Sequence, residues 1–389
     1  MTAPVFRQLV GQEETIAVLS DAVDAAHTGG SGMTHAWLFT GPPGSGRSVA
    51  ARAFAAALQC DRRGCGECAA CRTTMSGSHA DVTHVVPDGL SIGVATMRDL
   101  VLAAGRSPST GHRQVLIIED ADRLTEAAGN ALLKSIEEPP DRTVFLLCAP
   151  SPNPAEISVT IRSRCRHVPL RQPSTDAVTA LLTEQDGVDP GLARLASSAA
   201  QGHIGRARRL ATDATARERR DAILAIPRRL TSVSACFGAA DALISAAESE
   251  ATAANEGLAE REKAELETAL GKGGTGKGAT KAARGSAGQL KELERRQKSR
   301  MTRAQRDTLD LALVDLAAFY RDVLVLRLGA PVSAIHIDTA DTAAAAATQW
   351  TPESILRRID AILRCREAIE NNVRPRIAVE AMMLELWRG

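Results

Sequence analysis

The sequence predicts an α/β protein, with a phosphate-binding loop and a parallel sheet in its N-terminal half and helices in its C-terminal half. Apolar runs at 36–40, 114–120 and 143–148 have the pattern of strands that are buried on both faces. The segments between these runs have helical spacing, and strands that alternate with helices indicate a doubly wound sheet. After Pro169 no strand pattern persists, and segments rich in Ala, Leu and Arg indicate small helical units.

Composition limits the class of protein. A chain of 389 residues that is 44% hydrophobic and 24% charged is typical of a globular protein with two or three domains. Its net charge of +1 predicts no general affinity for nucleic acid or membranes, so such contacts would need local patches. We see neither a basic-then-apolar leader nor an apolar run near the ~18 residues of a spanning helix. We therefore expect a cytoplasmic protein with no membrane partner.

A phosphate-binding loop is predicted directly after the first strand. An amphipathic helical pattern in 5–27 precedes that strand, and the order strand, glycine-rich turn, helix lets backbone N–H groups close around an anion. The spacing fits the pattern G-x-x-x-x-G-K-S/T except at Arg47, whose planar fork is bulkier than the usual lysine. Whether ATP or ADP binds stays open. The residues expected to line this site are Gly41, Gly44, Gly46, Arg47 and Ser48.

Two acids follow the run at 114–118. Glu119 and Asp120 stand at the carboxyl end of a predicted parallel strand, which is the sheet edge beside the phosphate loop. Carboxylates at that edge can hold Mg²⁺ or orient a water molecule. In isolation they are equally well an ordinary acidic strand end. Together with the phosphate loop they predict one shared site, with Mg²⁺ present only if nucleotide binds.

Four of the eight cysteines form a cluster that is typical of a metal site. They are Cys60, Cys65, Cys68 and Cys71. This spacing suits tetrahedral Zn²⁺ held by four thiolates at ~2.3 Å, and Gly64 and Gly66 permit the tight turns that bring the ligands together. A ferredoxin-like iron–sulfur cluster is the competing interpretation, but the cysteine–proline that ends that motif is missing. Because all four ligands come from the protein, we expect structural zinc.

The C-terminal half contains one segment of unusual composition. Residues 250–304 are poor in large apolar side chains and rich in Glu, Lys, Gly and Ala, so we interpret them as a solvated low-complexity insertion or linker, partly helical. The Lys-Gly run at 271–278 mimics a phosphate loop but has no strand before it. Helical patterning returns at 305–328, and Thr351-Pro352 is a capping signal for another helix.

With these pieces in hand, the chain resembles the bacterial clamp-loader AAA+ family of DNA polymerase III. The resemblance covers about residues 5–210 well and the C-terminal helices more loosely. One mark is the four-cysteine insertion directly after the phosphate-loop helix. Three further marks are the segments Asn130–Pro140, Thr160–Cys165 and Asn372–Arg376.

The resemblance implies three domains and a set of partners. The implied domains are a nucleotide-fold domain at 1–168 with the zinc module at 60–71, a helical lid at 169–213, and a helical collar at 214–389 that contains the insertion. Clamp-loader subunits of the delta and gamma/tau kinds form a hetero-pentameric ring. That ring opens the sliding clamp and closes it around primer-template DNA, driven by ATP in its motor subunits.

The resemblance also implies a role for Arg164. Ser163-Arg164-Cys165 matches the motif whose arginine reaches into the ATP site of the neighbouring subunit. A guanidinium there neutralises charge that develops on the transferred phosphoryl group. The alternative is a surface arginine in a basic loop, since Arg162, Arg166 and Arg171 are close in sequence.

Three departures separate this chain from the motor subunits of the family. Arg47 replaces the lysine of the phosphate loop, and Glu119-Asp120 reverses the Asp-Glu pair that binds the metal. The lid arginine of the family aligns near Gly205, while Arg206 is one residue off and therefore ~100° around a helix. These changes predict a subunit that does not hydrolyse ATP by itself.

Two alternative functions remain. One is an ATP-hydrolysing motor subunit of the same loader. The other is a nucleic-acid-binding zinc protein, in which Arg62, Arg63 and Arg72 beside the cysteines touch phosphates. The zinc module has no aromatic platform on which bases could stack, which disfavours this second alternative.

Overall fold

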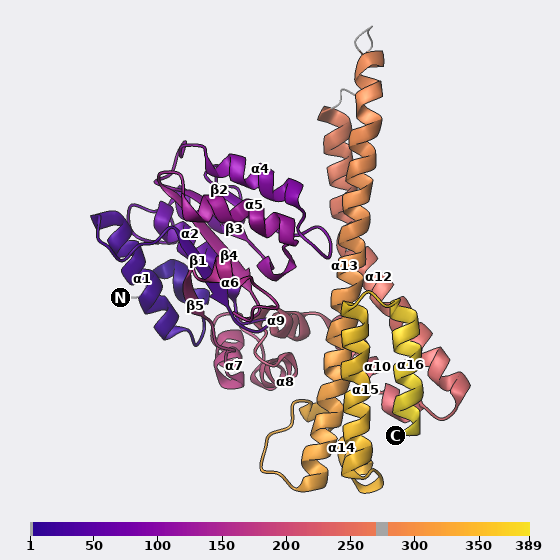
Figure 1. Cartoon of the computed structure of the whole chain (residues 1–389). Helices are drawn as coiled ribbons and strands as arrows, with labels where there is room; N and C mark the ends of the chain where they lie inside the picture. Colours follow the sequence, from indigo (N-terminus) through magenta and orange to yellow (C-terminus); the bar gives the residue numbers. More distant parts are fainter. Residues whose placement is uncertain (1–2, 270–278) are drawn as a thin grey trace. The chain divides into compact units, whose positions relative to one another are not determined.

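The structure is a computed structural model, and it describes residues 3–269 and 279–389 (Figure 1). The chain forms two compact units, Met1–Ala211 and Thr212–Gly389. The Lys-Gly run at 271–278 lies outside the described residues. Within the described ranges, no helix is both long enough and apolar enough to cross a membrane.

The first unit is built on a five-stranded parallel sheet with the strand order β2-β3-β4-β1-β5. The strands are β1 (Ala36–Thr40), β2 (Val82–Val85), β3 (Gln114–Ile118), β4 (Thr143–Ala149) and β5 (Arg166–Pro169). All residues of β1, β3 and β4 are buried, as their continuous apolar runs predict. The two edge strands, β2 and β5, are short and contain polar residues, so the sequence did not reveal them.

Helices cover both faces of this sheet, which confirms the predicted α/β class (Figure 1). They are η1 (Pro4–Gln8), α1 (Glu13–Thr28), α2 (Arg47–Gln59), α3 (Ala69–Ser76), α4 (Val94–Ala104), η2 (Ala121–Arg123), α5 (Glu126–Glu137) and α6 (Val159–Arg162). On one face, alternate strand residues such as Trp37 pack against Phe54 of α2, with ring centroids 4.9 Å apart. On the other face, residues such as Leu38 join Leu132 of α5 in a second core.

Three short helices complete the first unit. They are α7 (Thr175–Glu184), α8 (Pro190–Ala200) and α9 (Ile204–Thr212). Ser174 and Asp189 cap α7 and α8, because each side chain accepts a backbone N–H of the first turn. These helices fall within the segment for which the sequence predicts a lid, although the division into three domains remains a prediction.

All regular secondary structure in the described residues of the second unit is helical. Its helices are α10 (Ala214–Leu224), α11 (Ile226–Arg229), α12 (Val233–Ala269), α13 (Ala279–Leu328), η3 (Ile337–Thr339), α14 (Ala340–Gln349), α15 (Pro352–Glu370) and α16 (Pro375–Arg388). Leu313, Phe319 and Ile362 lie in one core that several of these helices share. The Thr351 hydroxyl accepts the N–H of Ser354 at the start of α15, as the capping signal predicts.

Helices α12 and α13 form a long hairpin (Figure 1). The partly helical character expected for 250–304 is confirmed, and the helices extend further than expected: the described residues on both sides of 270–278 are helical, which rules out the alternative of a linker. Beyond Ala251 of α12, polar contacts join the two helices, including an ion pair of 2.8 Å between Arg300 and Glu262. A segment rich in Ala, Glu, Lys and Arg has high helix propensity even without a core to pack on.

Candidate functional site

The phosphate loop joins β1 to α2 in the strand–turn–helix arrangement that its sequence predicts. Gly44 and Gly46 have φ angles of +86° and +91°, which favour glycine. At Gly41 the limit is space, because a Cβ atom would lie 2.6 Å from the carbonyl oxygen of Leu170. The glycines of the motif are thus explained by backbone geometry.

Two residues of this loop, Arg47 and Gly44, make close contacts within the first unit, whereas a third, Ser45, has a hydroxyl that is unpaired among the described residues. The Nη1 atom of Arg47 donates a hydrogen bond of 2.9 Å to the carbonyl oxygen of Gly41, so the guanidinium folds back over the loop. His203, just before α9, packs so closely on Gly44 that an added Cβ there would lie 2.5 Å from the Cβ of His203. The buried hydroxyl of Ser45 has no hydrogen-bond partner in the described part of the chain.

The two acids follow β3, beside the loop. The Oε1 atom of Glu119 lies 2.8 Å from Nε2 of His84. His84 belongs to β2 and was not predicted as a site residue from the sequence. Burial opposes ionisation of Glu119, but hydrogen bonds from His84 and Ser48 and the charges of His84 and Arg52 outweigh it and lower the pKa of this carboxyl. Asp120 has a φ of +48°, and its Oδ2 atom lies 3.9 Å from Nε of Arg123. The structure thus brings Glu119 to the loop through Ser48.

Arg164 lies between α6 and β5, with its side chain 36% exposed. Its Nη2 atom is 2.6 Å from Oε1 of Glu137 in α5, and its Nη1 atom donates to the carbonyl oxygen of Thr160 at 3.0 Å. A weaker contact of 3.4 Å reaches the hydroxyl of Ser163. The guanidinium is therefore held at the surface by groups from two elements, and none of these partners belongs to the phosphate loop.

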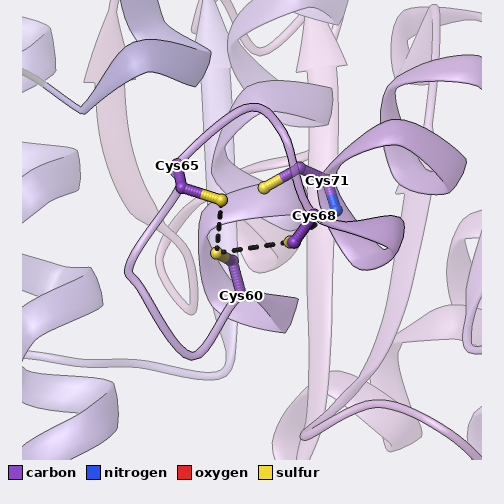
Figure 2. A group of neighbouring side chains, drawn as sticks. All are labelled: Cys60, Cys65, Cys68 and Cys71. Carbon is purple, nitrogen blue, oxygen red and sulfur yellow. Dashed lines mark hydrogen bonds between the residues drawn. The ribbon is translucent and has the colours of Figure 1, made fainter.

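The four clustered cysteines converge at the other end of α2 (Figure 2). All four Sγ atoms lie within 4.8 Å of one another, and the Cys60 sulfur is 3.6 Å from those of Cys65 and Cys68. Four sulfurs around one zinc ion at ~2.3 Å would be ~3.8 Å apart in a tetrahedron, so the spacing fits such an ion. The set of sulfur donors and its geometry can therefore hold a metal ion.

Local structure explains why these sulfurs meet. Cys60 ends α2, Cys68 caps α3, and the Cys68 sulfur accepts the N–H of Cys71 at 3.4 Å. Between them Gly64 has a φ of +99°, and a Cβ atom there would lie 2.6 Å from Cγ2 of Val5. The tight turn thus packs against η1 and needs glycine.

The thiols have unequal acidity. Backbone N–H groups of Glu67 and Cys68 lower the pKa of Cys65 to about 6, which favours the thiolate that metals bind. Burial raises the pKa of Cys71, which lies in the core against α2. A bound cation would offset this penalty by stabilising the thiolate.

Comparison with known proteins identifies relatives for the N-terminal part of the chain. Residues 11–174 match the family described as DNA polymerase III, delta subunit. The chain is 34% identical over 207 residues to DNA polymerase III subunit tau of Bacillus subtilis, a match that covers 51% of this chain and 35% of that protein. It is 37% identical over 166 residues to subunit delta' of the same organism, covering 42% and 50%. It is 37% identical over 181 residues to subunit delta' of Yersinia pestis, covering 45% and 48%. Each match spans half or less of the relative's length.

Proposed function

We propose that the whole chain is a delta-prime-type subunit of the DNA polymerase III clamp loader that does not hydrolyse ATP itself. Its residues 11–174 match the family described as DNA polymerase III, delta subunit, and delta' subunits are among its relatives. In this role it would form a hetero-pentameric ring with delta and gamma/tau subunits. The ring would load the sliding clamp onto primer-template DNA. The alternative is a motor subunit, because relatives of the tau kind match at comparable identity.

The single observation that carries the proposal is the hydrogen bond of 2.9 Å from Arg47 to the carbonyl oxygen of Gly41. A lysine at this position reaches the β- and γ-phosphates as a mobile point charge. Arg47 instead donates to the loop's own backbone. The close packing of His203 on Gly44 also supports the proposal, because the segment that carries His203 lies directly against the loop. The loop keeps its backbone shape, but its cation is engaged with the loop itself and not free to follow a phosphate.

The geometry of Arg164 supports its assignment as an arginine finger that acts on a neighbouring subunit. A finger must be exposed, since its target lies on another chain, and fixed, since a transition state is stabilised best by groups already in place. Arg164 is partly exposed, and Glu137 and the carbonyl of Thr160 hold its fork. In this proposal Arg164 neutralises charge on the phosphoryl group that the neighbouring motor subunit transfers.

We assign structural zinc to Cys60, Cys65, Cys68 and Cys71. When bound, the ion would link the end of α2 to α3 through four thiolates, which leaves no open position for a substrate. The chain itself prepares the site with the two glycine turns and the capping contact from Cys71 to Cys68.

The test is ATP hydrolysis by the reconstituted loader with one subunit changed at a time. We expect Arg164→Ala to reduce turnover at the neighbouring site by ~10³-fold, the usual effect of losing such a finger. Arg47→Ala should leave turnover unchanged, as should Arg171→Ala, a control at an exposed arginine that pairs with Glu14. Normal turnover with Arg164→Ala would refute the finger. Slower turnover with Arg47→Ala, or hydrolysis by the isolated chain, would favour the motor alternative.

A further inference from the structure

A pocket of about 420 Å³ lies at the sheet edge opposite the phosphate loop. Its lining includes His35, Arg113 and Arg142, which directly precede β1, β3 and β4. These strands are neighbours in the order β3-β4-β1 and run parallel, so their first residues meet at one edge. The proposed phosphate loop follows the opposite, carboxyl end of β1. The two places are therefore separated by the length of the sheet.

The pocket brings two arginines together without a carboxylate partner. Arg113 is partly buried, and its Nη2 atom donates to the carbonyl oxygen of Ala26 at 3.2 Å. Both arginines line the same pocket, and burial, and next the charge of Arg142, lower the pKa of Arg113. No ion pair joins either arginine to an acid among the described residues. Arg142 is exposed, so anions from solvent can reach it, and a pair of cations that line one pocket favours the binding of an anion.

The other polar groups of the lining are compatible with an anion. Asp141 lines the pocket but forms no ion pair there with the two arginines, which leaves an excess of positive charge. The Nε2 atom of His35 is engaged with the carbonyl oxygen of Ile136 at 2.7 Å, which fixes the ring. The hydroxyl of Thr143 donates to the carbonyl oxygen of Ala104. Thr34 lies at the same edge and also lines the pocket.

Arg142 occupies an unfavourable backbone conformation. Its φ angle is +60°, in the left-handed region where a residue with a Cβ atom is strained and glycine is not. Its carbonyl oxygen accepts the N–H of Gln114 at 3.0 Å, which ties the turn to the start of β3. An arginine at a position that suits glycine suggests that the side chain is needed there for a ligand.

We propose that this pocket binds a phosphate group, with Arg113 and Arg142 donating charge-assisted hydrogen bonds to its oxygens. The guanidinium fork matches phosphate oxygens, and two forks suit a compact dianion better than a monovalent one. The phosphate is either a free small phosphate or part of a nucleic-acid backbone, because both present the same oxygens. The inference is independent of the proposed clamp-loader function and concerns a different edge of the sheet.

The test titrates the whole protein at low salt with inorganic phosphate, measured by calorimetry and by the rise in Tm. We expect Arg142→Gly to weaken phosphate binding by about 10-fold or more, the effect of losing a charge-assisted hydrogen bond. Without phosphate, the same variant should have an equal or higher Tm, because glycine relieves the left-handed strain. Arg113→Gln is the second variant and should weaken binding to the same extent. Arg106→Gln is the matched control, since this exposed arginine does not line the pocket.

Three outcomes would contradict the proposed phosphate site. The proposal is overturned if the wild type does not bind phosphate, if both pocket variants bind it as the wild type does, or if Arg47→Gln abolishes binding while Arg142→Gly does not. A short single-stranded oligonucleotide serves as a second probe. Loss of its binding in Arg142→Gly identifies backbone phosphate as the source, whereas unchanged oligonucleotide binding with lost phosphate binding identifies a free phosphate.

Discussion

The sequence motifs at the two ends of helix α2 differ in how completely they keep the side chains that their chemistry needs. At its start, the phosphate loop keeps its backbone path, but Arg47 hydrogen-bonds to the loop's own carbonyl oxygen. At its end, four cysteine sulfurs within 4.8 Å of one another face a common point. The cysteine motif has all its ligand positions, whereas the phosphate-loop motif has one altered position. A motif therefore predicts a backbone path more safely than it predicts chemistry, which depends on each side chain.

The largest expected effect is loss of the metal. Removing zinc with a chelator, or Cys71→Ser, should destabilise the first unit by several kcal/mol, because binding free energy of a structural zinc contributes directly to folding. Metal analysis should find about one zinc per chain in the wild type and none in the variant. Cys165→Ser, outside the cluster, should keep its zinc. An unchanged Tm after complete zinc removal would contradict the structural role.

The next effect concerns the packing of the phosphate loop. Gly44→Ala should cost about 3 kcal/mol of unfolding free energy, because it adds a Cβ atom 2.5 Å from His203 at a φ of +86°. Gly77→Ala is the matched control, with a φ of +80° but no atom within 4 Å of the added Cβ. It should cost only the backbone strain, about 1 kcal/mol. Denaturant unfolding measures both, and equal costs would mean that the loop and His203 are not packed as described.

A smaller effect should follow when the lysine of the motif is restored. Arg47→Lys removes the fork that binds the carbonyl oxygen of Gly41, so we expect ATP to bind about 10-fold more tightly, the value of one charge-assisted hydrogen bond. We expect no ATP turnover from this variant, since the resemblance to the clamp-loader family aligns Asp120 with the glutamate of the motor subunits. Arg52→Lys, further along α2, controls for the change of residue type. Nucleotide titration measures the affinity, and no gain would show that the internal hydrogen bond does not limit binding.

The smallest effect is a pH dependence at His203. Burial, and next the charge of Arg206, lower the pKa of this imidazole. The unfolded chain therefore takes up a proton first, so the contribution to stability is complete above the unfolded pKa of about 6.5 and is lost as the pH falls below it. In His203→Gln the fall in Tm between neutral and mildly acidic pH should be shallower, although His167, whose pKa is also lowered by burial, remains. An unchanged slope would contradict this assignment.

Much of the fold was predictable because burial leaves a strong pattern. The continuous apolar runs of β1, β3 and β4 are separated by segments with helical spacing, and this combination predicts buried parallel strands. The edge strands β2 and β5 escaped notice because exposed edges admit polar residues such as His84 and His167. The full length of the helical hairpin and the pairing of its two helices were not predicted, because the segment expected to be only partly helical lacks the large apolar residues that mark a packed helix.

The candidate site was predictable in its residue types but not in its partners. Nothing in the sequence places His84 beside Glu119, because that contact depends on the pairing of β2 with β3. The same holds for Asp81, whose buried carboxylate accepts hydrogen bonds from the loop at 109–111. The run Ser109-Thr110-Gly111 marks a turn, yet no local rule says which acid it surrounds. Hydrogen-bond partners that are distant in sequence can be identified only once the fold is known.

The order of the sheet has a consequence for the synthesis of the chain. Strand β1 pairs only with β4 and β5, and its Thr40 meets His167 across 127 positions of sequence. During translation β1 therefore emerges long before either neighbouring strand, and although α2 follows at once and can cover one of its faces, both of its edges stay unpaired. Strand β5 must be synthesised before both edges of β1 can be paired. We expect the first unit to need protection by chaperones in this interval, whereas the helices of the second unit form through local contacts as they emerge.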